Sequence, residues 1–180
     1  MNNKGSTLVL LIIAMAIIIT LGVSVLDIAV MQYNIKKNNT EAKQSFYMAE
    51  TGLNVAFVDA YGLMDEAAED SLKKAYEYLL LFPLNEMEAE NVFRENYKLY
   101  MTANLENSVY RGSNPIVEIT NGGTLLFIGD KLTANVKSKY NSENIEKTAC
   151  VDIIILVPDY YDFKNNSADL SHYINFNDWS

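Results

Sequence analysis

The sequence contains few of the residues on which disulfide frameworks, zinc sites and nucleic-acid surfaces depend. Of its 180 residues one is a cysteine, Cys150, and one is a histidine, His172, so neither a disulfide network nor a site of paired histidines can form within the chain. Fourteen lysines and arginines stand against 23 aspartates and glutamates, which leaves a formal net charge of −9. The basic residues gather only in two adjacent pairs, at 36–37 and 73–74, and this argues against binding to nucleic-acid phosphates.

No pattern in the sequence is typical of an enzyme. It has neither a glycine-rich phosphate loop nor a nucleophile elbow, and the acidic run DEAAED at 65–70 lacks the spacing of a calcium loop. We therefore expect no catalytic residue, no metal site and no cofactor. The acidic run is interpreted as a solvated helix face, Cys150 as a small residue of a sheet and His172 as a surface residue.

The apolar residues are concentrated near the N-terminus. Residues 8–26 carry no charge, and nineteen helical residues are about 28 Å long, close to the thickness of a bilayer core. The apolar part of a secretory signal peptide is shorter, about 7–15 residues, and precedes a small-x-small cleavage site. The triplet Ala14-Met15-Ala16 has that pattern but lies inside the run. The sequence therefore favours a single transmembrane helix, whose orientation the flanking lysines do not decide.

The scarcity of proline and glycine predicts that this helix continues past the span. No proline occurs before Pro83, and Gly52 is the only glycine in 23–61. Apolar residues at 46, 49, 53, 56, 57 and 60 repeat at three- and four-residue steps, which is typical of an amphipathic helix. We expect one helix from about Thr7 to Tyr61, roughly 80 Å long, that is apolar on all sides in its first half only.

The rest of the chain divides into a helical part and a part with strand periodicity. Apolar residues at 72, 75, 76 and 79 form a stripe that Pro83 ends, and Asn85 with Glu88 has the pattern of a capping box for a second helix. From Asn114 the period changes to two. PIVEIT, an Asn-Gly-Gly turn at 121–123 and TLLFI predict a hairpin, and two longer alternating runs follow at 131–140 and 145–157. We predict an α+β fold in which the long helix packs on a four-stranded antiparallel sheet, with a helical insert between them.

The last segment, DYYDFKNNSADLSHYINFNDWS, concentrates aromatic and acidic residues at 159–180. Two interpretations stay open. The segment is an exposed contact surface for a partner or ligand, or it is an aromatic flap that packs back on the sheet.

Two segments resemble a known family. Lys4-Gly5 followed by STLVL is similar to the class III signal of type IV prepilins, in which a membrane peptidase removes a short basic leader ending in glycine and the new first residue is methylated. The resemblance implies cleavage after Gly5 and N-methylation of Ser6. The segment SFYMAETGLNVA at 45–56 resembles the corresponding stretch of PilX-type minor pilins. Five residues carry that match: Phe46, Ala49, Glu50, Gly52 and Leu53.

One position departs from the family pattern. Most type IV pilins have a glutamate five residues after the cleavage point, which is held to neutralise the terminal amine of a neighbouring subunit, and here that position is Leu10. The pseudopilin K group, found at the tip of secretion pseudopili, also lacks this acid. The likeness implies a subunit that primes assembly or sits at the tip, and the alternative within the family is another minor pilin that tolerates leucine.

The resemblance assigns a role to each part of the chain. The parts are a leader (1–5), a transmembrane or filament-core helix (6–30), the amphipathic helix half (31–62), the helical insert (63–112), the antiparallel sheet (113–158) and the aromatic and acidic tail (159–180). It implies a structural subunit of a type IV pilus or related filament, with other minor pilins, the major pilin, the prepilin peptidase and the assembly platform as partners.

The implied location is the cytoplasmic membrane, with a single span and the C-terminal domain outside, and afterwards the extracellular pilus. The alternative to this family assignment is a bitopic membrane protein that is not processed and whose external domain binds a ligand or partner. The mature N-terminus distinguishes the two.

Overall fold

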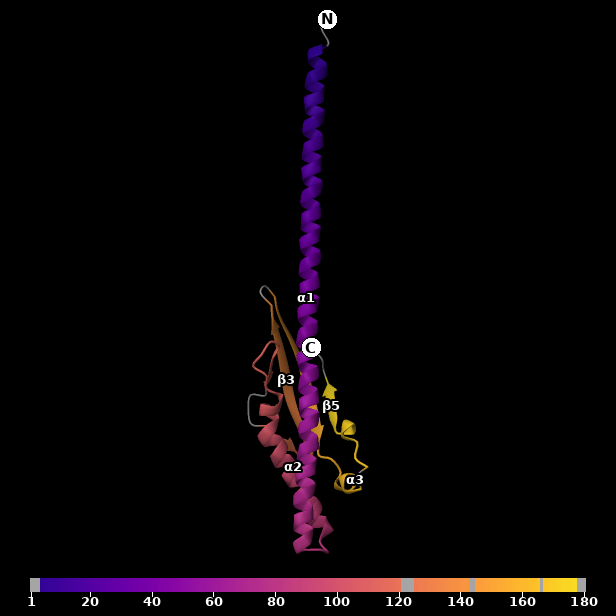
Figure 1. The fold of residues 1–180 in the computed structure, drawn as a ribbon, viewed down its shortest axis with the longest axis vertical. Coiled ribbons are helices and arrows are strands. Elements are labelled where there is room, and N and C mark those ends of the chain that lie inside the picture. The colour runs from indigo at the N-terminus through magenta and orange to yellow at the C-terminus, as the bar shows by residue number, and fades with distance from the viewer. Residues whose placement is uncertain (1–3, 121–124, 143–144, 166, 178–180) are drawn as a thin grey trace. The chain divides into compact units, whose positions relative to one another are not determined.

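The computed structural model describes residues 4–120, 125–142, 145–165 and 167–177, with side chains from residue 7 onward. The fold is α+β, with a long N-terminal helix and a five-stranded antiparallel sheet (Figure 1). The chain forms two compact units, one up to Lys43 and one from Gln44. The elements are α1 (Lys4–Leu81), α2 (Glu86–Val109), β1 (Ile116–Ile119), β2 (Phe127–Ile128), β3 (Lys131–Asn141), β4 (Glu146–Leu156), α3 (Tyr160–Lys164), a 3-10 turn η1 (Leu170–His172) and β5 (Ile174–Asn177).

Helix α1 extends beyond Tyr61, where the sequence interpretation ended it, to Leu81. Gly62 lies inside the helix, although a glycine at such a position costs about 1 kcal/mol relative to alanine. Burial of the side chains that follow outweighs this cost, since they continue the apolar stripe at three- and four-residue steps. The buried apolar residues of this stretch are Leu63, Met64, Ala67, Ala68 and Ala75.

The break between α1 and α2 lies at Pro83, as predicted, because proline has no amide hydrogen to donate within a helix. The predicted capping box is not formed. Asn85 occupies the N-cap position of α2 but makes no capping hydrogen bond with its side chain. Its amide donates instead to the hydroxyl of Tyr78 at 3.2 Å, while the carboxylate of Glu88 accepts from Asn91 at 3.3 Å.

The two longest strands pair as predicted from their alternation. β3 and β4 form an antiparallel hairpin whose register extends from Lys131 opposite Leu156 to Asn141 opposite Glu146. Alternate residues of both strands face the core, as the period of two requires. The buried residues are Leu132, Ala134, Val136 and Ser138 on β3, and Ala149, Val151, Ile153 and Ile155 on β4.

The predicted hairpin between PIVEIT and TLLFI is wrong. β1 pairs with β3 at residues 136–139, and β2 pairs with β3 at residues 131–132, so both segments lie along the same edge of one long strand. The turn expected at 121–123 lies outside the described residues. β3 is eleven residues long, so one of its edges has room for both short segments.

The sheet has five strands, not the four predicted, and the additional strand comes from the C-terminal segment. β5 pairs antiparallel with β4, which places Ile174 opposite Ile155 and Phe176 opposite Ile153. Ile174 is buried and Phe176 partly buried against the core. This segment therefore packs back on the sheet, one of the two interpretations that the sequence left open.

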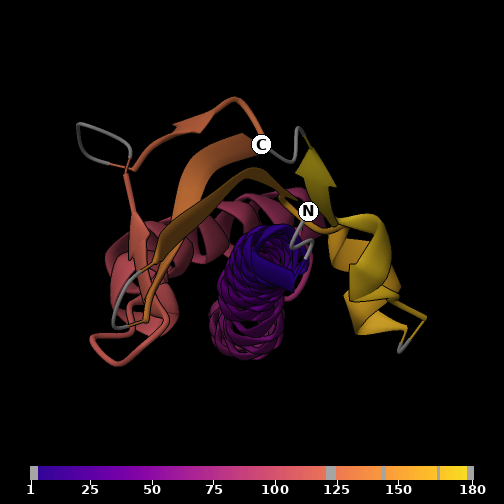
Figure 2. The ribbon, with the colours of Figure 1, turned by 90° about the horizontal axis from the view of Figure 1, so that it is seen from above.

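Within the second unit, α1 and α2 lie on the same side of the sheet (Figure 2). The ring of Phe57 on α1 is 4.9 Å from that of Phe176 on β5, and an ion pair of 2.9 Å joins Asp59 on α1 to Arg111 after α2. The unit therefore has one hydrophobic core, to which both helices and the inner face of the sheet contribute.

Candidate functional site: an exposed apolar helix and the motif that follows it

The first unit presents an apolar surface on every side of α1. Each residue from 7 to 40 is exposed, and Asp27 is the only charged residue between Thr7 and Ile35. By length and composition this is the one helix among the described residues that can cross a membrane. A helix that is apolar all round requires lipid or other apolar helices around it.

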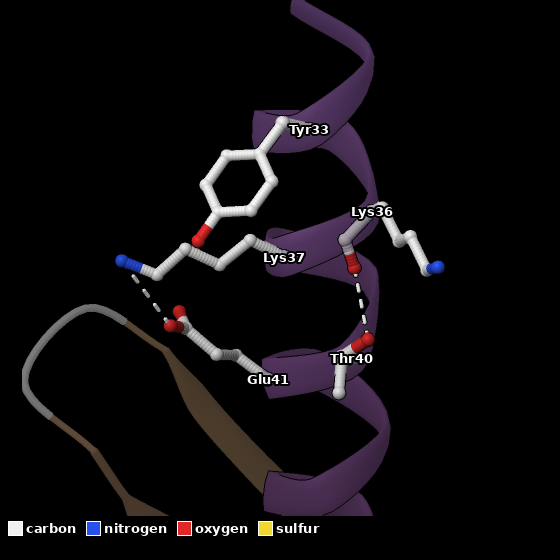
Figure 3. A pocket seen from close by; sticks show the side chains of 5 residues that line it. All are labelled: Tyr33, Lys36, Lys37, Thr40 and Glu41. Carbon is white, nitrogen blue, oxygen red and sulfur yellow. Dashed lines mark hydrogen bonds and ion pairs between the residues drawn. The ribbon is translucent and has the colours of Figure 1, made fainter. Parts of the chain in front are cut away.

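The apolar surface gives way to polar side chains between Tyr33 and Glu41 (Figure 3). Lys37 and Glu41 form an ion pair at 3.7 Å, and the hydroxyl of Thr40 donates to the backbone carbonyl of Lys36 at 2.9 Å. These residues line a shallow depression, but all of them belong to one helix. With no second element to form an opposing wall, the depression is not a ligand site; tyrosine and lysine are instead typical of the end of a transmembrane helix.

The residues predicted for processing fall at the start of α1. Gly5 and Ser6 belong to its first turn, while residues 1–3 and the side chains of residues 4–6 lie outside the described set. Leu10, at the position of the missing acid, is 69% exposed. The nearest carboxylate along the helix is Asp27, about 25 Å further at 1.5 Å per residue, so it does not substitute for an acid at residue 10 within the same chain.

The five residues of the PilX-like segment differ in how far the domain covers them. Ala49, Gly52 and Leu53 are buried in the second unit. Phe46 is 40% exposed although it is aromatic, and Glu50 is half-buried. The segment therefore combines residues that hold α1 to its own domain with residues that the domain leaves accessible.

At Gly52 α1 lies close to the sheet. A Cβ atom at this position would overlap Ser138 Oγ and would lie 3.0 Å from Pro115 Cγ and 3.1 Å from Val117 Cγ2. Ser138 is itself buried, and its hydroxyl makes no hydrogen bond within the part of the chain that the structure describes. Packing thus favours the glycine of the motif, because a larger residue would force the side chains of Ser138, Pro115 and Val117 to shift.

No three His, Cys, Asp or Glu side chains of the described residues are placed to hold a metal ion. Cys150 is a half-buried free thiol on β4, and His172 is exposed at the end of η1.

The strongest electrostatic cluster of the second unit connects α2 to the turn before β3. Asp130 accepts a hydrogen bond from Arg94 and lies 3.4 Å from Lys98. Burial alone would raise the pKa of Asp130, but the hydrogen bond from Arg94 and the charges of Arg94 and Lys98 outweigh it and lower that pKa. The arrangement joins α2 to the turn before β3.

Sequence reasoning missed one surface. The connection between α1 and α2 exposes several large apolar side chains between Leu80 and Met87. The signal was present in the sequence. Leu80, Leu81 and Phe82 continue the apolar character after Leu79 has completed the stripe, and Leu84 follows beyond Pro83.

The chain matches no known family model, no curated protein and no solved structure. The resemblance to type IV pilins therefore rests on the two N-terminal segments of the sequence.

Proposed function

We propose that this protein is a minor pilin or pseudopilin, a structural subunit of a type IV pilus or related filament. The observation that carries the proposal is the apolar helix surface, exposed at each described position from 7 to 40, which leads directly into a helix-on-sheet unit. Lipid covers such a surface while the protein is in the membrane, and helices of neighbouring subunits cover it in a filament. The function is then assembly by helix packing and not catalysis.

The segments at 4–10 and 45–56 support the same proposal. A subunit that begins at Ser6 would carry a free amine at the end of an apolar helix, and a buried charge of this kind needs a partner. Leu10 supplies no carboxylate for the amine of a preceding subunit. A subunit that primes assembly or occupies the tip has no preceding subunit, and this position fits the leucine. Its partners would be other minor pilins, the major pilin, the prepilin peptidase and the assembly platform.

The mature N-terminus tests the proposal. Mass spectrometry of the full-length protein from membranes and sheared filaments should find N-methyl-Ser6 as the first residue. Gly5→Arg places a large cation before the proposed scissile bond and should leave the precursor uncut, whereas Ser6→Ala should still be cleaved. Wild-type protein in filaments that retains the residues before Ser6 would overturn the assignment.

A bitopic membrane protein is the second candidate, because the one candidate span among the described residues fits such a protein as well as it fits a pilin. It predicts that residues before Ser6 remain in the mature protein and that sheared filaments contain none of it. The same mass spectra separate the two candidates.

A further inference from the structure

The connection between α1 and α2 carries a compact group of exposed apolar side chains, here named the apolar turn. Its residues are Leu80, Leu81, Phe82, Leu84 and Met87. Leu84 is 100% exposed and the other four are between 53% and 82% exposed. α1 enters the second unit at Gln44, and the turn lies at the other end of that unit (Figure 1). Single exposed leucines are ordinary, whereas several large exposed apolar side chains along one turn are typical of a site of interaction.

The apolar turn is held in one conformation by its own hydrogen bonds. The backbone N–H of Phe82 donates to the carbonyl of Tyr78 at 3.0 Å, and the N–H of Asn85 donates to the carbonyl of Phe82 at 3.1 Å. The rings of Tyr78 and Phe82 lie 5.0 Å apart, and Asn85 also bonds the hydroxyl of Tyr78. Pro83 restricts the backbone between them. The turn is therefore preorganised, and binding a partner costs little entropy for ordering it.

Acidic residues flank and interrupt the apolar turn in the sequence, and one lysine from α3 pairs with one of them. Between Ala75 and Phe93 the chain has no lysine or arginine. The acidic residues of this stretch are Glu77, Glu86, Glu88 and Glu90. Glu86 pairs with Lys164 at 2.6 Å and Glu90 with Arg94 at 3.5 Å. Glu77 and Glu88 are exposed and form no ion pair with any described residue.

These charges select among the surfaces that could cover the turn. An anionic lipid surface is repelled by the glutamates, and a second copy would bring the same glutamates against them. A concave apolar surface with cations at its rim fits the leucines, which fill the groove. It also fits Glu77 and Glu88, with which the cations pair.

We propose that the apolar turn docks into an apolar groove of another protein, and that lysine or arginine side chains border this groove. The proposal does not depend on the filament assignment, since a processed pilin and an unprocessed bitopic protein expose the turn in the same way. It adds a partner contact at the end of the domain remote from Gln44, distinct from the packing of the apolar helix.

Site-specific photo-crosslinking of the full-length protein in its own cells tests the proposal. A benzophenone amino acid replaces Leu84, and the matched control carries it at Leu99, a 67% exposed leucine on α2 outside the turn. Position 84 should give a discrete product several-fold stronger than position 99. Peptide mapping should place the crosslink in an apolar segment of another protein flanked by lysine or arginine. Glu77→Lys and Glu88→Lys should each reduce the yield roughly two- to fivefold, as expected for single exposed ion pairs, whereas Glu118→Lys on β1 should not.

Four results would overturn the proposal: equal products at both positions, a crosslink to lipid, a crosslink to a second copy of this chain, or a yield unaffected by reversal of Glu77 and Glu88. Trypsin resistance of each variant verifies that its domain is folded. The processing of Ser6, read by mass spectrometry on the same samples, reports on the filament assignment separately.

Discussion

Replacing Gly52 by alanine tests whether α1 lies as close to the sheet as the structure has it. The added methyl group would overlap Ser138 Oγ and lie 3.0 and 3.1 Å from carbon atoms of Pro115 and Val117. Overpacking of this kind costs about 1–3 kcal/mol. Alanine also stabilises a helix relative to glycine by about 1 kcal/mol, which offsets part of the cost. We expect Gly52→Ala to lower the free energy of unfolding by up to about 2 kcal/mol.

Gly62 provides a matched control on the same helix. Nothing lies within 4 Å of the position that its Cβ would occupy, so Gly62→Ala gains helix propensity without a new contact. The difference between the two variants isolates the contact between α1 and the sheet, and it should be about 1–3 kcal/mol. Adding Ser138→Ala to Gly52→Ala removes the closest contact and a hydroxyl without a described partner, and should recover part of the loss.

Urea unfolding of residues 44–180, followed by circular dichroism, measures these differences. The fragment contains the whole hydrophobic core, so we expect it to fold without the apolar helix. The slope of the free energy against urea should stay the same in all variants, which would show that stability and not the unfolded state has changed. If Gly52→Ala proved as stable as Gly62→Ala, the close approach at Gly52 would be refuted.

Three further predictions concern the core, a buried phenol and the filament. Phe57→Asp places a carboxylate beside Phe176 and should destabilise the fragment by about 3 kcal/mol or more, and an unchanged thermal melt would contradict the packing of α1 on β5. Burial raises the pKa of Tyr97 above its ordinary value of 10.0. As the pH rises past 10, the phenol therefore ionises in the unfolded chain before it ionises in the folded one, and the free energy of unfolding falls. Tyr97→Phe should reduce this loss of stability at alkaline pH, measured by urea titrations at several pH values. If the free energy of unfolding fell equally in both proteins above pH 10, the prediction would be wrong. For a tip subunit, Leu10→Glu should not increase incorporation, because its carboxylate finds no amine; immunogold label that spreads along the shaft in the variant would rule out the tip position.

The features that the sequence predicted correctly depend on local periodicity. α1 was predicted through its span and amphipathic half because no proline interrupts it, and β3 and β4 because their inner faces are apolar at every second residue. The break at Pro83 has an equally local cause. In each case the residues that decide the structure are neighbours in the sequence.

The features that the sequence did not predict depend on distant partners. β5 contains only two apolar residues, Ile174 and Phe176, and becomes a strand because the edge of β4 is available to it. β1 and β2 were assigned to each other by a turn rule, yet both pair with β3. The side chain of Asn85 was assigned to a cap but bonds Tyr78, which its position in the sequence does not disclose.

The domain explains only some of the residues of the PilX-like segment. The domain itself accounts for Ala49, Gly52 and Leu53, since all three are buried in its core and Gly52 has no room for a side chain. The domain does not account for Phe46, which contacts Tyr47 at a ring distance of 6.3 Å but stays 40% exposed. The domain covers only part of this ring. Under the proposal, a subunit that packs alongside α1 would cover the rest.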